Sequence, residues 1–66
     1  MTVRLNFRAE VKNKQGKRVL VVQANELYNK FLQRVRREAK SKGTTEGTMV
    51  VTAKEWAPGE SKTFDL

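Results

Sequence analysis

The 66-residue sequence contains no cysteine and no histidine. Without cysteine, neither a disulfide nor a thiolate metal site can stabilise the fold, and a zinc site without histidine would have to use carboxylates alone. The same absences remove the strongest nucleophile and the usual proton shuttle of enzymes. The seven acidic residues form no spaced pair that resembles a catalytic dyad. The sequence therefore predicts a protein that is not an enzyme and that uses no metal or other cofactor.

Long apolar segments are also missing. No apolar run approaches the roughly 20 residues of a membrane-spanning helix, and the N-terminus has no signal-peptide pattern. We therefore expect a soluble, cytoplasmic protein that makes no membrane contact. A chain this short has room for one domain, residues 1–66, with a small core. Dimerisation is a common way for such a small domain to bury more surface, so a homodimer is expected.

Basic residues are present in excess, with 14 Lys and Arg against seven Asp and Glu and a net charge of +7. The net charge is +5 over residues 1–24, +4 over residues 25–43 and −2 over residues 44–66. Because like charges repel in a compact chain, this surplus does not help folding. It is better explained as a field that attracts a polyanion, and nucleic acid is the partner class that it indicates.

The N-terminal third has the pattern of a β-hairpin. Apolar and polar residues alternate without interruption over residues 3–12, which predicts a strand with one buried face. The next four residues end in Gly16, which suits a type I turn with a bulge. Residues 18–23 contain a run of four apolar residues, 19–22, and form the second predicted strand. This turn favours pairing of Val11 with Val19.

A helix is predicted next. Asn25 is a candidate N-cap, and Glu26 suits the first turn of a helix because it complements the helix dipole. Gly43 is a plausible C′ residue, so the helix should span about 17 residues. Helical spacing relates the apolar residues Leu27, Tyr28, Phe31, Leu32, Val35 and Ala39.

The last third predicts a strand over residues 48–56, a type II turn over residues 57–60 and a short fourth strand over residues 62–66. The predicted fold is α+β: an N-terminal hairpin, one amphipathic helix on one face of the sheet, then one or two strands, in the order ββαββ. In this element order and in the hairpin closed by Gly16, the chain resembles the β-grasp, or ubiquitin-type, architecture. The resemblance implies a fold and no functional residue.

Two basic surfaces are candidate phosphate contacts. One is the helix face opposite the apolar stripe, and the other is the tip of the hairpin. An ordinary solvated helix face and an ordinary polar turn would carry similar residues, so the inference depends on the surfaces occurring together. The candidates are Lys30, Arg34, Arg36, Arg37 and Lys40 on the helix and Lys14, Lys17 and Arg18 at the tip.

A third candidate surface is the sheet face that the helix leaves open. The predicted register places basic and apolar side chains together on it, which is too apolar a surface to face water without a partner. It could stack single-stranded nucleic acid or form a twofold dimer, and its single clear aromatic favours the dimer. The residues expected there are Arg4, Arg8, Leu20, Val22, Val50 and Trp56.

Together these features predict a small, basic, non-enzymatic nucleic-acid-binding protein with an accessory or regulatory role. Duplex DNA is favoured over RNA as the ligand, with contacts mainly to phosphates and few to bases. The alternative is a protein-binding module, such as a phage-type or plasmid-type inhibitor or adaptor, that docks on an acidic protein surface through the basic helix or an exposed strand edge.

Overall fold

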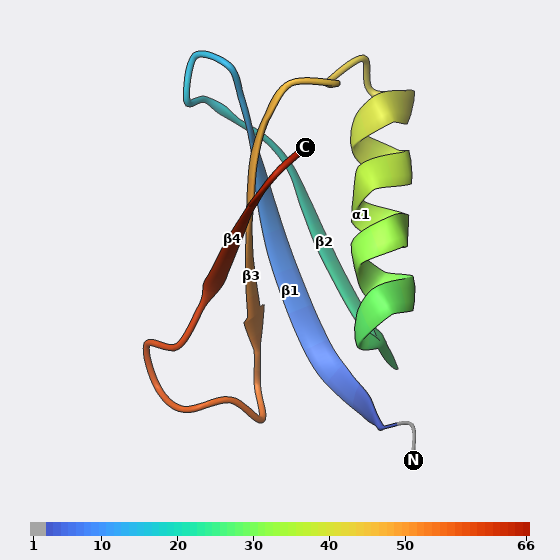
Figure 1. Cartoon of the computed structure of the whole chain (residues 1–66), viewed down its shortest axis with the longest axis vertical. Helices are drawn as coiled ribbons and strands as arrows, with labels where there is room; N and C mark the ends of the chain where they lie inside the picture. Colours follow the sequence, from blue (N-terminus) through green and yellow to red (C-terminus); the bar gives the residue numbers. More distant parts are fainter. Residues whose placement is uncertain (1–2) are drawn as a thin grey trace.

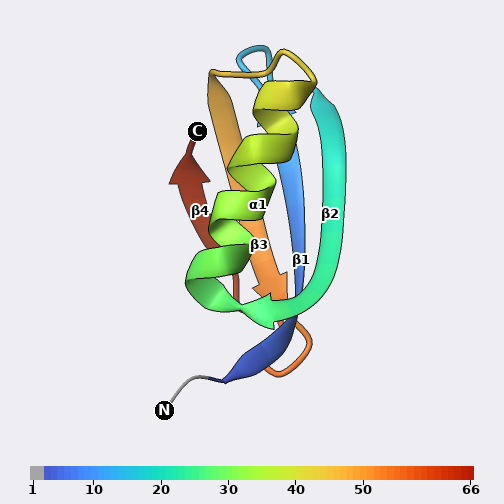
Figure 2. The same ribbon diagram turned by 90° about the vertical axis from the view of Figure 1, so that its right-hand side faces the viewer.

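The computed structural model describes residues 3–66, which form one sheet and one helix. The elements are, in chain order, β1 (Arg4–Asn13), β2 (Arg18–Leu27), α1 (Tyr28–Ser41), β3 (Gly47–Ala53) and β4 (Lys62–Asp65). Every neighbouring pair of strands is antiparallel, in the order β2-β1-β3-β4. The helix lies across one face of this sheet (Figures 1 and 2). The predicted α+β fold with the order ββαββ is therefore confirmed. Within residues 3–66, no helix is long and apolar enough to cross a bilayer.

The core lies between α1 and the sheet. Alternation along β1 buries Phe7, Ala9 and Val11 and exposes most of the even-numbered residues, as the pattern predicts. On β3 the predicted inward residues Met49 and Val51 are fully buried. The helix covers them with its apolar stripe, in which Phe31 and Val35 have no exposed surface. The buried apolar residues are Phe7, Ala9, Val11, Val22, Phe31, Leu32, Val35, Ala39, Met49 and Val51.

The register of the first hairpin differs from the prediction. The turn forms as expected, because Gly16 has φ 83° and its N–H donates to the Asn13 carbonyl oxygen at 2.9 Å. A bulge follows the tip, and Val11 consequently pairs with Leu20 and not with Val19. One extra residue in a strand reverses the face of every residue beyond it. Val22 therefore faces the helix, where it is buried, and the prediction that Leu20 and Val22 lie on the open face is wrong.

The start of the helix also differs. β2 continues to Leu27, so Asn25 and Glu26 belong to the sheet and pair with β1. The helix begins at Tyr28, spans 14 residues and has no side-chain cap. Asn25 instead donates its side-chain amide to Asn6 Oδ1 at 3.1 Å. The long first strand offers backbone partners to this segment, and this pairing outweighs the local capping signal.

The end of the helix is as predicted. Gly43 has φ 80°, and its N–H donates to the Lys40 carbonyl oxygen at 2.9 Å. The N–H of Thr44 donates to the Ala39 carbonyl oxygen, also at 2.9 Å. These two bonds define a Schellman motif, which satisfies carbonyl groups that the helix leaves free.

The third strand ends earlier than its sequence indicates, at Ala53. The chain turns there, so the alternation of faces does not extend to Trp56. The Trp56 ring packs edge-on against Phe7 with centroids 5.8 Å apart, on the helix side of the sheet. Its predicted position on the open face is therefore wrong. The type II turn is confirmed by Gly59 at φ 81° and by a 2.9 Å bond from the Glu60 N–H to the Ala57 carbonyl oxygen.

Candidate nucleic-acid interface

The outer side of α1 carries four basic side chains, which we call the basic face: Lys30, Arg36, Arg37 and Lys40. All four are exposed, and none forms an ion pair with another residue in the range 3–66. At 100° per residue they lie within a sector of about 120° that contains no acidic residue. The apolar stripe fixes this arrangement, because burial of Phe31 and Val35 turns these cations toward solvent. The structure thus brings together four of the five predicted helix residues.

Arg34, the fifth predicted helix residue, is engaged elsewhere. Its Nε and Nη2 donate to Glu26 Oε2 and Oε1 at 2.7 and 3.2 Å. The hydrogen bond from Arg34 holds the pKa of the Glu26 carboxyl group below its ordinary value. Sequence reasoning missed this pair because it placed Glu26 in the first turn of the helix. In β2, Glu26 instead lies on the side of the sheet that faces α1.

A shallow hollow of about 280 Å³ lies beside the C-terminal part of the basic face. Arg36 and Lys40 line it together with Thr44, Thr45 and Leu66. Two cations beside two hydroxyl groups suit an anion with several oxygen acceptors, because hydrogen bonds between ionised partners are short and strong. Thr44 and Thr45 are not among the predicted phosphate contacts. The cap at Gly43 brings them here by turning the chain back over the last helical turn.

The tip of the first hairpin lies at the same end of the molecule as the end of α1 (Figure 1). The tip is held by Asn13, whose Oδ1 accepts N–H bonds from Gln15 at 3.0 Å and Lys17 at 2.9 Å. Lys14 pairs with Glu46 at 3.6 Å, with both side chains more than two-thirds exposed. Among the predicted tip residues, Lys17 is the one without an ion pair in the described chain.

On the open face of the sheet, two of the predicted cations share one carboxylate. Glu10 Oε1 lies 3.0 Å from Arg8 and 3.5 Å from Arg18. Arg4 is exposed near the start of β1. Of the four apolar residues expected on this face, Val50 alone lies there, because Leu20, Val22 and Trp56 are on the helix side. Among residues 3–66, this face therefore carries neither Trp56, on which a stacking site would depend, nor Leu20 and Val22, on which the predicted dimer surface depended. The homodimer stays a prediction.

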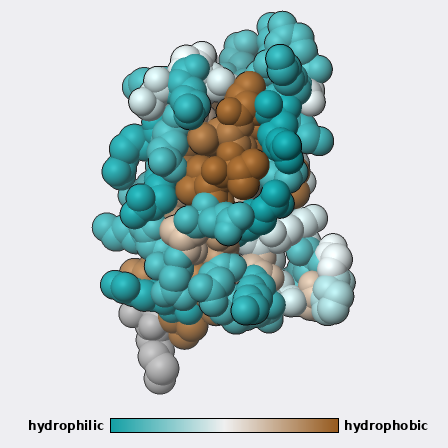
Figure 3. Space-filling view, turned by 180° about the vertical axis from the view of Figure 1, so that it is seen from behind, coloured by the Kyte–Doolittle hydropathy of each residue, from teal (hydrophilic) through white to brown (hydrophobic). Residues whose placement is uncertain are grey.

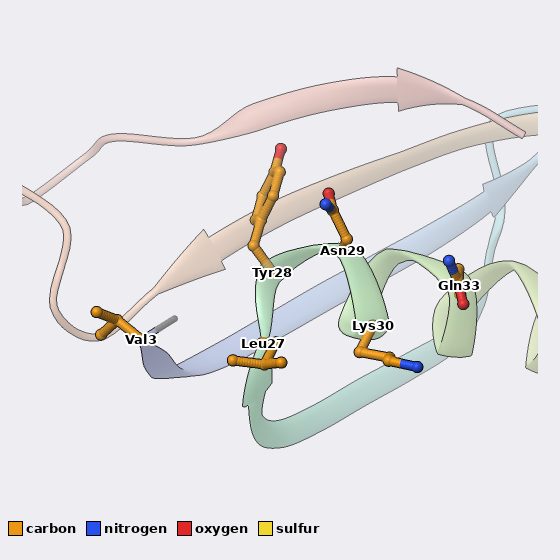
Figure 4. A pocket seen from close by; sticks show the side chains of 6 residues that line it. All are labelled: Val3, Leu27, Tyr28, Asn29, Lys30 and Gln33. Carbon is orange, nitrogen blue, oxygen red and sulfur yellow. The ribbon is translucent and has the colours of Figure 1, made fainter. Parts of the chain in front are cut away.

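A second hollow, of about 380 Å³, lies at the start of α1 (Figure 4). Tyr28 and Asn29 project from one side of the helix start, whereas Leu27 and Lys30 project from the other, so the side chains do not converge on one point. The lining contains no histidine, cysteine or carboxylate. Across residues 3–66, no group of three or more such side chains could hold a metal ion. The ionisable side chains of its lining, Tyr28 and Lys30, project to opposite sides and do not form a pair.

No protein-family model matches this chain, and no curated protein or solved structure matches it either.

Proposed function

We propose that this protein binds nucleic acid, and duplex DNA in particular, through phosphate contacts from the basic face and from Lys17 at the hairpin tip. The observation that carries the proposal is the basic face itself: four exposed cations on one helix, with no carboxylate among them. A helix is a rigid support, so these cations cannot scatter to separate parts of the surface. Arginine can also hold a phosphate through two hydrogen bonds at once.

The spacing of the basic face suits a duplex. Lys30 and Lys40 are ten residues apart, which corresponds to about 15 Å along a helix axis. The same length of B-DNA carries about nine phosphate charges, so each of the four cations has a phosphate within reach. The open sheet face has no aromatic platform, which disfavours a single strand as the main ligand. Contacts of this kind hold DNA with little selection among sequences, which supports an accessory or regulatory role.

The proposal is tested by fluorescence anisotropy of a labelled duplex of mixed sequence, titrated at several salt concentrations. Five neutralised phosphates, four from the basic face and one from Lys17, give a slope of log K against log salt of about −4.5. The substitution Arg37→Gln should make that slope shallower by about 0.9. The matched control is Lys54→Gln, which removes the same charge from an exposed residue just beyond the end of β3. A slope near zero, or equal losses in both variants, would contradict the proposal.

The second candidate function is docking on an acidic protein surface. It is favoured by the net charge of −2 over residues 44–66, which would repel a polyanion that wrapped around the β4 side. The same basic face would make the contacts. Columns of immobilised duplex DNA and heparin distinguish the two functions. Retention on both columns that is lost in an Arg36→Glu, Arg37→Glu double variant supports DNA, whereas capture of a defined acidic protein without DNA retention supports docking.

A further inference from the structure

The two edges of the sheet differ sharply. β4 forms one edge with four residues, including the charged Lys62 and Asp65. β2 forms the other edge and is ten residues long. An edge strand presents free N–H and C=O groups, and proteins commonly protect such edges by shortness, charge or proline. β4 is protected by its shortness and its charges, whereas β2 is too long to be protected by shortness.

The middle of β2 also lacks the other protections. Residues 19–24 read Val-Leu-Val-Val-Gln-Ala and contain no charge, proline or glycine. Val21 is 38% exposed, and Val19 and Leu20 are partly exposed. Figure 3, which looks at the molecule from behind the view of Figure 1, shows an apolar area bordered by hydrophilic side chains. The centre of this edge is an uncharged, partly apolar strip with backbone groups available for pairing.

Both ends of the β2 edge are basic. Lys17 and Arg18 stand at its start. At its end, Arg34, Arg4 and Arg37 are all close enough to Glu26 to lower the pKa of its carboxyl group. Arg34, Arg4 and Arg37 thus outnumber the acidic residues of this cluster, Glu26 and Glu38. A complementary ligand has an apolar centre with acidic residues on both sides.

We propose that the β2 edge binds an extended, acidic-flanked segment of another protein by strand addition. Backbone hydrogen bonds to β2 supply the affinity, and the apolar centre and basic ends select the sequence. A second copy of this chain fits less well, because either strand direction would bring the basic end of one β2 against a basic end of the other. Each copy also carries a net charge of +7. The pairing groups of β2 lie outside the basic face, but the basic ends of the edge share Lys17 and Arg37 with the proposed DNA contacts, so a protein partner and a duplex would compete for these two cations.

The test uses a synthetic labelled peptide, acetyl-Asp-Glu-Val-Thr-Ile-Thr-Val-Glu-Asp-amide, in anisotropy titrations with the whole chain. The matched variants are Val21→Glu on β2 and Thr63→Glu on β4. Val21 and Thr63 stand at opposite ends of one cross-strand row, joined by Glu10 and Val50. Both changes add one negative charge to an exposed strand residue. Val21→Glu should weaken binding about tenfold or more because it places a charge against the apolar centre of the peptide, whereas Thr63→Glu should leave binding within about twofold.

Two further measurements separate strand addition from general charge attraction. A peptide with the same centre but lysine flanks, and one with N-methylated backbone amides in the centre, should both lose binding. Amide hydrogen exchange should slow in β2 when the first peptide is bound and remain unchanged in β4. Equal binding of all three peptides would overturn the proposal. A dimer of the free protein that Val21→Glu dissociates would also overturn it, because a second copy would then occupy the edge.

This site and the proposed DNA contacts can fail independently. Lys40→Gln removes one charge from the basic face. Lys40 lines the hollow that also contains Thr45 and Leu66. The substitution should weaken duplex binding and leave peptide binding unchanged. Loss of both activities in this variant would show that the peptide is held by general charge attraction, and the strand-addition proposal would be wrong.

Discussion

Arg34 on the helix and Glu26 at the end of β2 form a two-bond ion pair, with its shorter bond at 2.7 Å. The strand runs directly into the helix, from Leu27 to Tyr28, and no side chain caps the helix start. The pair therefore ties the helix to the strand that precedes it, at the place where the chain changes direction. The same contact keeps Arg34 from acting as a free cation of the basic face.

The ion pair predicts a loss of stability in acid. Hydrogen bonding to Arg34 lowers the pKa of Glu26 in the folded protein, so its contribution is complete above the unfolded value of about 4.3 and disappears as the pH falls through the folded value. Bonds from Asn6 lower the pKa of Glu55 in the same direction. We expect the urea midpoint to fall as the pH decreases below about 4.3. Glu26→Gln should flatten this dependence.

The control for the acid prediction is Glu38→Gln, which removes an exposed carboxylate that forms no ion pair in the described chain. Urea titrations at several pH values give the midpoint of each variant. An unchanged pH dependence in Glu26→Gln, relative to this control, would contradict the assigned role of the pair.

Gly47 should be the glycine least tolerant of substitution. It starts β3 with φ 138°, and an added Cβ would collide with the Lys12 carbonyl oxygen and crowd Asn13. Gly43 also has a positive φ, but an added Cβ there meets open space. We expect Gly43→Ala to cost about 1–2 kcal/mol from backbone strain, and Gly47→Ala to cost about 2–4 kcal/mol because overpacking adds to the strain. Urea unfolding of the two variants measures the difference, and equal costs would contradict the close approach.

Phe31 should be essential for folding. Its side chain is fully buried and stacks on Phe7 with centroids 5.1 Å apart. Truncation of such a residue costs about 3–5 kcal/mol, which equals the stability that a core of this size supplies. We expect Phe31→Ala to be largely unfolded at 25 °C by circular dichroism. The control Val21→Ala, at an exposed position, should change stability by no more than about 0.5 kcal/mol. A folded Phe31→Ala would show that the core is more tolerant than its packing indicates.

Arg34 and Arg36 should differ in DNA binding although both are exposed arginines of the same helix. Arg36 lies in the basic face without an ion pair, whereas Arg34 is held by Glu26. We expect Arg36→Gln to make the salt slope shallower by about 0.9 and Arg34→Gln to change it by clearly less. Anisotropy titrations of one duplex with both variants check this. Equal changes would mean that Arg34 leaves Glu26 to reach DNA.

The elements of the fold could be predicted because their signals are local. Alternation along residues 3–12, the turn at Gly16, the apolar stripe of the helix and the turn before Glu60 each follow from a few neighbouring residues. The wrong predictions concern the register of the pairing between β1 and β2 and the residue at which β2 ends. The bulge beside Val11 and the continuation of β2 to Leu27 result from contacts with β1, whose residues are distant in sequence. No local pattern contains that information.

The candidate site was predictable in part. The helical period placed Lys30, Arg36, Arg37 and Lys40 together, and the structure confirms this arrangement. The helical period could not reveal the pairing of Arg34 with Glu26, because this pairing depends on β2 continuing past Asn25. It also could not place Thr44 and Thr45 beside Arg36.

The sequence by itself determined which segments become strands and helix, and which side of the helix is basic, because hydrophobic periodicity and turn residues act over short distances. The tertiary structure decided which cations remain free, which edge of the sheet is left open and which side of the sheet Leu20, Val22 and Trp56 occupy. The physical reason is that strand register and ion pairs form between segments far apart in the chain. A shift of one residue in that pairing moves every side chain beyond it to the opposite face.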